Sequence, residues 1–230
     1  MAKAVQQTSL VFSRRGGARK GAGRKRADGR RGVGVTHRAR PRVDARTPVH
    51  VTLRLRRDVP NLRSQLGMHV VWRAFAAARD RLGMRLVHWS AQRDHLHLLV
   101  EPESGRALSR GVQGLCIRLA KALNHAFGRR GGVFADRYHG VPLRSPRQTR
   151  NALAYVLLNA RHHASGRGEA LSRGLDACSS SPCFDGWTVP RPPTHGPWSG
   201  TVHPAATWLL RTGWRRHGLI HPFEVPGVTS

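Results

Sequence analysis

Acidic residues are scarce in this chain, which has 12 Asp and Glu against 40 Lys and Arg and a formal net charge of +28 over 230 residues. A charge of this size repels itself and makes sense mainly if the partner is a polyanion. Only four of the basic residues are Lys. GC-rich coding sequence would explain that preference for Arg, but it does not explain the missing acids. Nucleic acid is therefore the expected partner.

Cysteine is also rare, and long apolar runs are absent. Cys116, Cys178 and Cys183 are too few for a disulfide framework, and Cys178 and Cys183 lack further ligands at a zinc spacing. No run approaches the roughly 18 apolar residues that cross a bilayer, and the first residues do not resemble a signal peptide. We therefore expect a cytoplasmic protein without a membrane partner.

Residues 1–46 lack apolar periodicity and carry fourteen Lys and Arg against two Asp, so we expect a basic disordered tail. Its Arg24, Lys25 and Arg26 are candidates for binding phosphates or a minor groove, although a merely solvated tail has the same composition. Three further regions follow: a folded domain at 47–166, a Pro/Ser-rich linker at 167–204 and a short basic extension at 205–230.

The folded domain alternates between strand and helix patterns. Period-two alternation predicts strands at 49–56, 85–92, 95–101 and 137–144, and three- to four-residue periodicity predicts helices at 68–82, 108–126 and 146–164. The two-residue turn Arg93-Asp94 makes the middle strands a hairpin. The order β-α-β-β-α-β-α predicts an α+β, ferredoxin-like sandwich, an antiparallel sheet with helices on one face plus an extra helix.

A further amphipathic helix is predicted at 205–219, after a stretch too rich in proline for regular structure. Its Trp208 and Trp214 can stack on bases or fill a small core, and we favour packing for both.

His95 and His97 lie in the predicted strand 95–101. Side chains two residues apart in a strand share a face, about 7 Å apart at their Cα atoms, so Leu96 faces the other way. Two imidazoles at this spacing can bind one divalent ion. They can equally be half-buried histidines that cover the sheet, because fourteen histidines make chance pairs such as His162-His163 common. His88 on the neighbouring strand could support such a site, although core packing explains it as well.

Tyr155 and Asn159 are four residues apart in the predicted helix 146–164, which places them on one face. Tyrosine is scarce, and Tyr138 is the other one in the chain. A tyrosine nucleophile therefore has two possible positions, of which Tyr138 is the second candidate. An isolated tyrosine on a helix is more often an aromatic at the edge of a core.

Three segments together change that balance. They are His-Leu-His-Leu-Leu-Val at 95–100, Gly-Val-Phe-Ala-Asp-Arg-Tyr at 132–138 and Ala-Tyr-Val-Leu-Leu-Asn at 154–159. In this order they resemble the single-tyrosine HUH transposases, which share a transposase IS200-like domain, and specifically their REP-associated branch. The resemblance covers residues 48–165. The chain departs from the family at Ala160, where proline is more frequent, and at Asp94, where asparagine is frequent.

The resemblance implies that His95 and His97 are metal ligands, Asn159 the third ligand and Tyr155 the nucleophile. The metal would be Mg²⁺ or Mn²⁺, which keeps open positions for a scissile phosphate. The activity implied is that of a metal-dependent endonuclease and strand transferase, which nicks and rejoins DNA through a 5′-phosphotyrosine. It also implies a bacterial protein associated with the nucleoid.

The DNA partner implied by the resemblance is single-stranded, palindromic or a hairpin, bound by a monomer or a homodimer. Charge near the proposed site comes from five basic residues, Arg118, Lys121, Arg144, Arg147 and Arg150. Two other functions fit the same sequence. One is a non-catalytic nucleic-acid-binding protein of the same fold, domesticated and regulatory, and the other is a metal-dependent nuclease that uses water.

Overall fold

A five-stranded antiparallel sheet organises the chain. The computed structural model describes residues 42–171, 174–189, 198 and 200–227, so the expected tail sites Arg24, Lys25 and Arg26 lie outside the described residues. The strands are β1 (Val49–Arg54), β2 (Asp80–Arg81), β3 (Met84–Ala91), β4 (His95–Pro102) and β5 (His139–Pro142). Their order across the sheet is β2-β3-β4-β1-β5, and all neighbours are antiparallel. Leaving aside the short β2, this is the ferredoxin-like order, so the predicted α+β fold class is confirmed.

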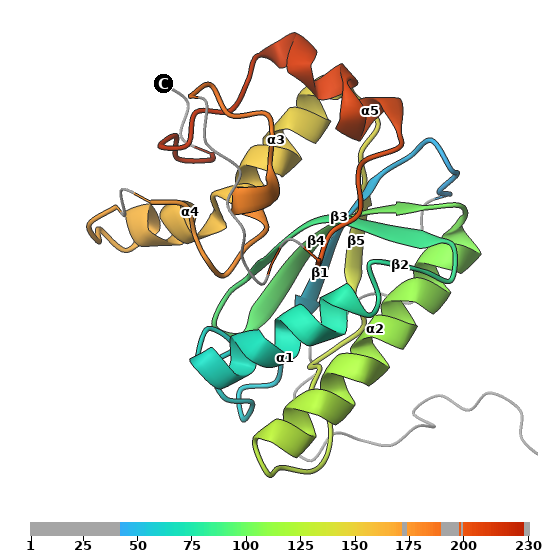
Figure 1. Cartoon of the computed structure of the whole chain (residues 1–230), viewed down its shortest axis with the longest axis vertical. Helices are drawn as coiled ribbons and strands as arrows, with labels where there is room; N and C mark the ends of the chain where they lie inside the picture. Colours follow the sequence, from blue (N-terminus) through green and yellow to red (C-terminus); the bar gives the residue numbers. More distant parts are fainter. Residues whose placement is uncertain (1–41, 172–173, 190–197, 199, 228–230) are drawn as a thin grey trace, which may run out of the picture. The chain divides into compact units, whose positions relative to one another are not determined.

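Two helices cover one face of the sheet, α1 (Gln65–Ala76) and α2 (Gly105–Ala126) (Figure 1). Alternate residues of β4 point to this side, and Leu96, Leu98 and Val100 join the core beneath the helices. The apolar stripe predicted for 108–126 is the buried side of α2. The core side chains on this face are almost fully buried. We call it the closed face.

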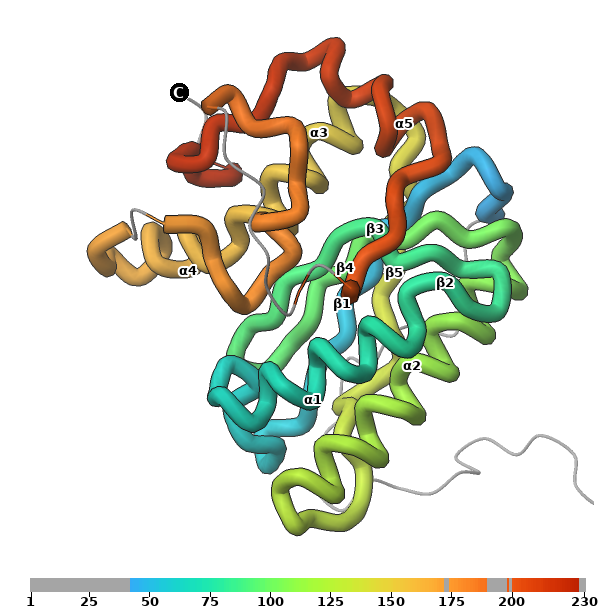
Figure 2. Tube along the Cα trace, in the orientation of Figure 1, coloured from blue at the N-terminus to red at the C-terminus, as the bar shows by residue number. Residues whose placement is uncertain are grey.

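The other face is covered by α3 (Pro146–Leu157) and by C-terminal residues that run beside it (Figure 2). The C-terminal part contains the 3₁₀ helices Ser181–Cys183 and Gly213–His217 and the short helix α5 (Trp208–Arg211). Leu99, from β4, packs here with Leu153, Val156 and Trp214. This second core fills only part of the face, and the rest is polar.

The helix predicted at 68–82 ends early, at Ala76. Residues after it leave the helix because the chain turns back as a hairpin, in which Asp80 pairs with Arg85 and Arg81 with Met84. Leu82 and Gly83 form the turn at φ 58° and 71°, a backbone region that favours glycine. Leu82, expected on the buried stripe, is instead 47 % exposed. Strand pairing has overridden the helical periodicity.

The helix predicted at 146–164 is two helices, α3 and α4 (Asn159–Gly166), with a break at Leu158. The predicted start is confirmed, since Ser145 Oγ accepts from Gln148 N and Pro146 occupies the first turn. At Leu158 the backbone has φ −113° and ψ 21°, outside the helical region. Leu158 is buried, and the break separates α3, whose buried side chains are mostly apolar, from α4, which buries Asn159 and Arg161.

The predicted helix 205–219 is also divided, into α5 and the 3₁₀ helix Gly213–His217. Its two tryptophans differ: Trp214 is buried in the second core, as predicted, whereas Trp208 is 50 % exposed. Packing is therefore the right interpretation for Trp214 only.

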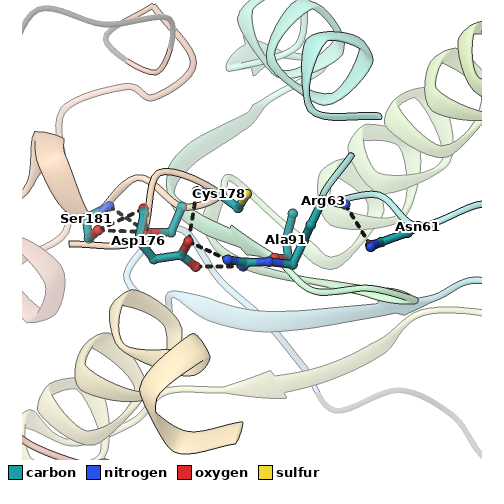
Figure 3. Close-up of polar contacts among 7 residues, drawn as sticks. Asn61, Arg63, Ala91, Asp176, Cys178 and Ser181 are labelled. Carbon is teal, nitrogen blue, oxygen red and sulfur yellow. Dashed lines mark hydrogen bonds and ion pairs between the residues drawn. The ribbon is translucent and has the colours of Figure 1, made fainter. Parts of the chain in front are cut away.

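Hydrogen bonds from Arg63 link residues 176–181 to the end of β3 (Figure 3). Its guanidinium makes two hydrogen bonds of 2.8 Å to the Asp176 carboxylate and one of 2.9 Å to the Ala91 carbonyl. The Asp176 carboxylate also accepts from Cys178 N, and its carbonyl accepts from Ser181 Oγ. This charge-assisted network fixes one wall of a pocket beside His95. Over the described residues, no helix is long and apolar enough to span a membrane.

Candidate functional site

The candidate site lies on the face of the sheet that α3 and the C-terminal residues cover only in part, which we call the open face. Here β1 and β4 face the break between α3 and α4. His95 and His97 both project to this face, as the alternation of β4 predicts, and their ring centroids are 4.8 Å apart. In the register of β1 and β4, Thr52 lies opposite His97 and Arg54 lies opposite His95. The pair therefore sits among polar neighbours on β1.

In both histidines, Nδ1 lies within hydrogen-bond distance of another side chain. His95 Nδ1 lies 2.9 Å from Asp94 Oδ1, and His97 Nδ1 lies 3.1 Å from His50 Nε2 and 3.3 Å from Thr52 Oγ1. When each Nδ1 carries the proton, the lone pair of each ring is at Nε2. His97 Nε2 is buried and has no hydrogen-bond partner among the described residues. Histidines that hold metals are oriented in this way by a second hydrogen bond.

Tyr155 lies directly against His97. Its ring centroid is 5.1 Å from His97, 5.8 Å from His50 and 5.3 Å from His162, with edge-on or tilted geometry. The side chain is half-buried and lines a pocket of about 930 Å³ together with His50 and Arg147. The expected nucleophile therefore lies between one of the two strand histidines and a pocket.

Asn159 begins α4, directly after the break. Its side chain is 1 % exposed, and neither amide atom has a hydrogen-bond partner among the described residues. Each unpaired buried polar atom costs on the order of 1–3 kcal/mol, so this carboxamide is a candidate to bind a ligand. The helix break has a consequence for the prediction, because Tyr155 and Asn159 do not share one uninterrupted helix.

His162 and His163, cited above as a pair that can arise by chance, lie beside the candidate site. His163 Nε2 is buried without a partner among the described residues, and its ring is 5.5 Å from that of His95. His162 Nδ1 donates to the Pro226 carbonyl at 2.8 Å. These contacts join α4 to the C-terminal residues on one side and to the strand histidines on the other.

Burial controls protonation in this cluster. Desolvation, followed by repulsion from His50 and His95, lowers the pKa of His97 to about 2, and desolvation lowers that of His50 to about 4. Burial and the nearby His95 also lower the pKa of His163. The hydrogen bond with His95 lowers the pKa of the Asp94 carboxyl. His50 and His97 are consequently neutral at pH 7, the state in which an imidazole can bind a metal.

The donor set fits a hard or borderline divalent cation. His97 Nε2 and the Asn159 carboxamide oxygen are buried without hydrogen-bond partners among the described residues, and Asp94 orients His95. An amide oxygen suits Mg²⁺ or Mn²⁺, whereas imidazole nitrogens favour a transition metal over Mg²⁺. In the part of the chain that is described, no three His, Cys, Asp or Glu side chains form a group that could hold a metal.

The predicted basic residues are spread over several parts of the molecule. Arg147 and Arg150 line the pocket of Tyr155, but Arg150 is held by Glu224 at 2.8 and 2.9 Å. Arg118 and Lys121 are exposed on α2, which covers the opposite face of the sheet. Arg144 lies at the start of α3 and lines a different pocket.

Tyr138 and His88 lie away from the candidate site. Tyr138 packs against the core beneath α1 and α2, with its hydroxyl 3.3 Å from Ser109 Oγ on α2. His88 is buried, with Nδ1 3.2 Å from Ser180 Oγ and its ring against Phe184, and burial lowers its pKa to about 4. Core packing is therefore what the structure shows for His88.

Sequence reasoning missed His50, Thr52 and the paired His162 and His163 as members of the site. His50 and Thr52 are on the polar side of the period-two pattern of β1. Their meaning depends on the register with β4, which the sequence does not provide. A polar face on a strand beside a His-x-His strand is the available signal.

Comparisons with known proteins place two transposases among the similar structures. No family model matches the chain, and no curated protein matches its sequence. The REP-associated tyrosine transposase, solved bound to a REP hairpin, is similar with a TM-score of 0.46 and 15 % identity, over 59 % of this chain and 76 % of that one. A candidate transposase from Deinococcus radiodurans R1 is similar with a TM-score of 0.37 and 12 % identity, over 60 % of this chain and all of that one. Both structural neighbours are described as transposases.

Proposed function

We propose that this chain is a metal-dependent tyrosine transposase that nicks and rejoins single-stranded or hairpin DNA through Tyr155. The observation that carries the proposal is the contact between Tyr155 and His97. The Tyr155 ring lies 5.1 Å from that of His97, whose Nε2 is buried without a hydrogen-bond partner among the described residues. The Asn159 carboxamide, one residue after the helix break, is buried and has no partner there either. A phenol beside imidazoles that could hold a cation suits phosphoryl transfer.

His95, His97 and Asn159 would hold the divalent ion. When bound, the ion supplies positive charge to a non-bridging oxygen of the scissile phosphate. Asp94 accepts from His95 Nδ1 and so directs the lone pair of His95 to Nε2, and the contacts of His50 and Thr52 with His97 Nδ1 would orient the His97 ring. Because His50 and His97 stay neutral, no proton has to leave them before ligation at pH 7.

Tyr155 supplies the nucleophile. Its phenol oxygen attacks phosphorus, the P–O3′ bond breaks, and the strand is left as a 5′-phosphotyrosine and a free 3′-hydroxyl. The phenol proton is lost to solvent, and the departing 3′ oxygen takes up a proton. In the reverse step a 3′-hydroxyl attacks the same phosphorus and the phenolate leaves, which suits rejoining because a phenolate is a better leaving group than an alkoxide.

Arg147 gives positive charge at the pocket of Tyr155, where a phosphate-bearing strand would approach. Arg150 lines the same pocket, and its bond to Glu224 would have to open before it could contact DNA. The expected partner is single-stranded or hairpin DNA, because the half-buried tyrosine accepts a strand more easily than a duplex.

Covalent trapping tests the proposal. The full chain is incubated with Mn²⁺ and a labelled palindromic single strand, denatured and separated by gel. We expect an adduct with wild type and none with Tyr155→Phe. An adduct that persists in Tyr155→Phe would contradict the assignment. Cleavage without an adduct would favour a water-using nuclease, and salt-sensitive binding without cleavage would favour the non-catalytic, regulatory alternative.

A further inference from the structure

A second pocket lies at the other end of α3. Its volume is about 650 Å³, and it shares no lining residue with the pocket of Tyr155. Its walls are formed mainly by three arginines, Arg46, Arg85 and Arg144, and by Trp208. Pro146 and Thr207 also line it. We call it the Trp208 pocket.

Two of the arginines have no salt bridge. In the described part of the chain, no salt bridge involves Arg46 or Arg144. Asp44 lies near Arg46, but its carboxylate accepts hydrogen bonds from Arg46 N and Thr47 Oγ1 rather than from the guanidinium. Arg144 makes a hydrogen bond of 3.5 Å to the Arg42 carbonyl, and the side chains of Arg46 and Arg144 are exposed. Two guanidinium groups outside salt bridges around one cavity are suited to an anion such as a phosphate.

Glu101 lies behind the pocket and holds two of the segments that line it. Its carboxylate is buried and accepts hydrogen bonds from Ala206 N, Thr207 N and Thr207 Oγ1 at 2.7–2.8 Å. Arg85 Nε lies 3.3 Å from the same carboxylate. With its Nε engaged, Arg85 is held in place while its two terminal nitrogens have no hydrogen bond among the described residues. The carboxylate fixes the segment that carries Trp208 rather than neutralising Arg46 or Arg144.

Trp208 offers an aromatic surface at the same place. Its indole is 50 % exposed, unlike Trp214, which fills the second core. Gly213 lies so close that a Cβ there would stand 2.7 Å from the indole, and Arg216 lies over the ring at 4.9 Å from its centroid. These two contacts hold the indole in place while half of its surface stays open.

We propose that the Trp208 pocket binds one nucleotide of single-stranded DNA outside the scissile phosphate, with the base against Trp208 and the phosphate on Arg46 and Arg144. Single-strand sites in proteins combine an aromatic platform with nearby cations in this way. The inference rests on the proposed function in taking DNA as the ligand, and it adds a second contact for the same strand.

The distance along α3 fits one continuous strand. Pro146 opens α3 and lines the Trp208 pocket, while Tyr155 is nine positions further along the same helix and lines the other pocket. At about 1.5 Å per residue the separation is roughly 14 Å along the axis. Arg147 lies between, so a strand that follows α3 would meet positive charge along its path.

Binding is tested with the full chain carrying Tyr155→Phe, so that DNA stays intact. The probe is a fluorescein-labelled oligothymidylate followed by anisotropy. The double variant Arg46→Ala/Arg144→Ala should lose about tenfold in affinity, and its salt slope should fall by about 0.7 for each lost phosphate contact. Trp208→Ala should lose about tenfold with an unchanged slope, because stacking releases no counterion.

The matched control is Arg118→Ala/Lys121→Ala, which removes the same charge from α2 on the opposite face. An equal loss in this control would overturn the pocket in favour of diffuse attraction, and so would a Trp208→Ala change below twofold. Arg144→Gln repeats the test in case Trp208→Ala disturbs α5. As a positive check, 5-iodouracil in the strand should crosslink to the peptide that contains Trp208.

Two competitors separate the sources of the ligand chemistry. Thymidine monophosphate should displace the probe at concentrations where inorganic phosphate does not. If phosphate alone competes equally well, the base contact is wrong and the proposal falls. The proposed function is measured separately by the Tyr155 adduct: no adduct with pocket-dependent binding defeats that function alone, and an adduct with pocket-independent binding defeats this inference alone.

Discussion

The two faces of the sheet bury different kinds of side chain, although the same strands form both. On the face under α1 and α2, the β4 residues Leu96, Leu98 and Val100 are at most 1 % exposed in a continuous apolar core. On the other face, His95 and His97 alternate with them, and the apolar core of Leu99 and α3 stops short of the histidines. One strand therefore serves stability with one set of side chains and a polar site with the other.

The difference shows in the kinds of group that are buried. In the described residues, the open face holds buried imidazole and carboxamide atoms without hydrogen-bond partners, on His97, Asn159 and His163, whereas the unpartnered atoms beside the first core are the indole nitrogens of Trp72 and Trp198. Imidazole and carboxamide groups can bind a cation, and indole nitrogens cannot. Substitutions at the adjacent β4 residues His97 and Leu98 can test the candidate site and the core separately.

His97→Ala should produce the largest loss of activity. Removing a ligand and the neighbour of Tyr155 should lower adduct formation by at least about 10²–10³-fold. The unfolding midpoint in denaturant should fall less than for a core residue, because the change removes the contacts with His50 and Thr52 but also a buried nitrogen without a hydrogen-bond partner among the described residues. Adduct yield and denaturant melts measure the two effects. A large fall in stability with retained activity would show that His97 is a packing residue.

Leu98→Ala is the matched change on the opposite face, one residue away. Its side chain is fully buried in the first core, so truncation should lower the free energy of unfolding by about 2–5 kcal/mol. The adduct yield per folded molecule should remain within about twofold below the unfolding transition. If Leu98→Ala abolished the adduct in folded protein, the two faces would not be independent.

Asp94→Ala tests the orientation of His95. Loss of the 2.9 Å contact frees the imidazole, and outer partners of this kind typically contribute about 10–100-fold to metal affinity. Calorimetric titration with Mn²⁺ should show a loss of that size. Asp94→Asn, which keeps an acceptor oxygen, should lose less. Equal Mn²⁺ affinity in all three proteins would remove His95 from the ligand set.

Much of the closed face could be predicted from the sequence, because its signals are local. The apolar alternation of 95–101 and the stripe of 108–126 each report burial on one element, and both elements formed as expected. The errors occur where long-range contacts decide. Leu82 follows a helical period but pairs into a hairpin, and the helix after Pro146 breaks at Leu158.

The open face was only partly predictable. His95 and His97 share a face as their spacing requires, and Tyr155 approaches them. His50, Thr52 and His163 arrive from other elements through strand register and the helix break, which no local pattern encodes. Their roles, like that of Asn159 as a ligand, stay predictions for the experiments above.

Acid should weaken the fold through the buried histidines. The pKa of His50 and of His88 is lowered to about 4 by burial, so between pH 6.5 and that value the unfolded chain binds protons that the folded chain does not. Stability is complete above pH 6.5 and falls as the pH is lowered, by about 1–2 kcal/mol per histidine at pH 5. Melts across this range should show the fall. His88→Asn should flatten it, and an unchanged slope would mean that His88 is protonated in the native state.

Tyr138→Phe should have the smallest effect, and it sharpens the comparison because the chain has two tyrosines, one on each face. Tyr138 packs against the closed core with its hydroxyl 3.3 Å from Ser109 Oγ, whereas Tyr155 lies beside His97. Losing the hydroxyl should lower the free energy of unfolding by about 0.5–1.5 kcal/mol and leave the adduct unchanged. The same gel that tests Tyr155→Phe measures it. If Tyr138→Phe lost the adduct and Tyr155→Phe kept it, the nucleophile would be on the closed face, and the separation of packing from chemistry between the two faces would be wrong.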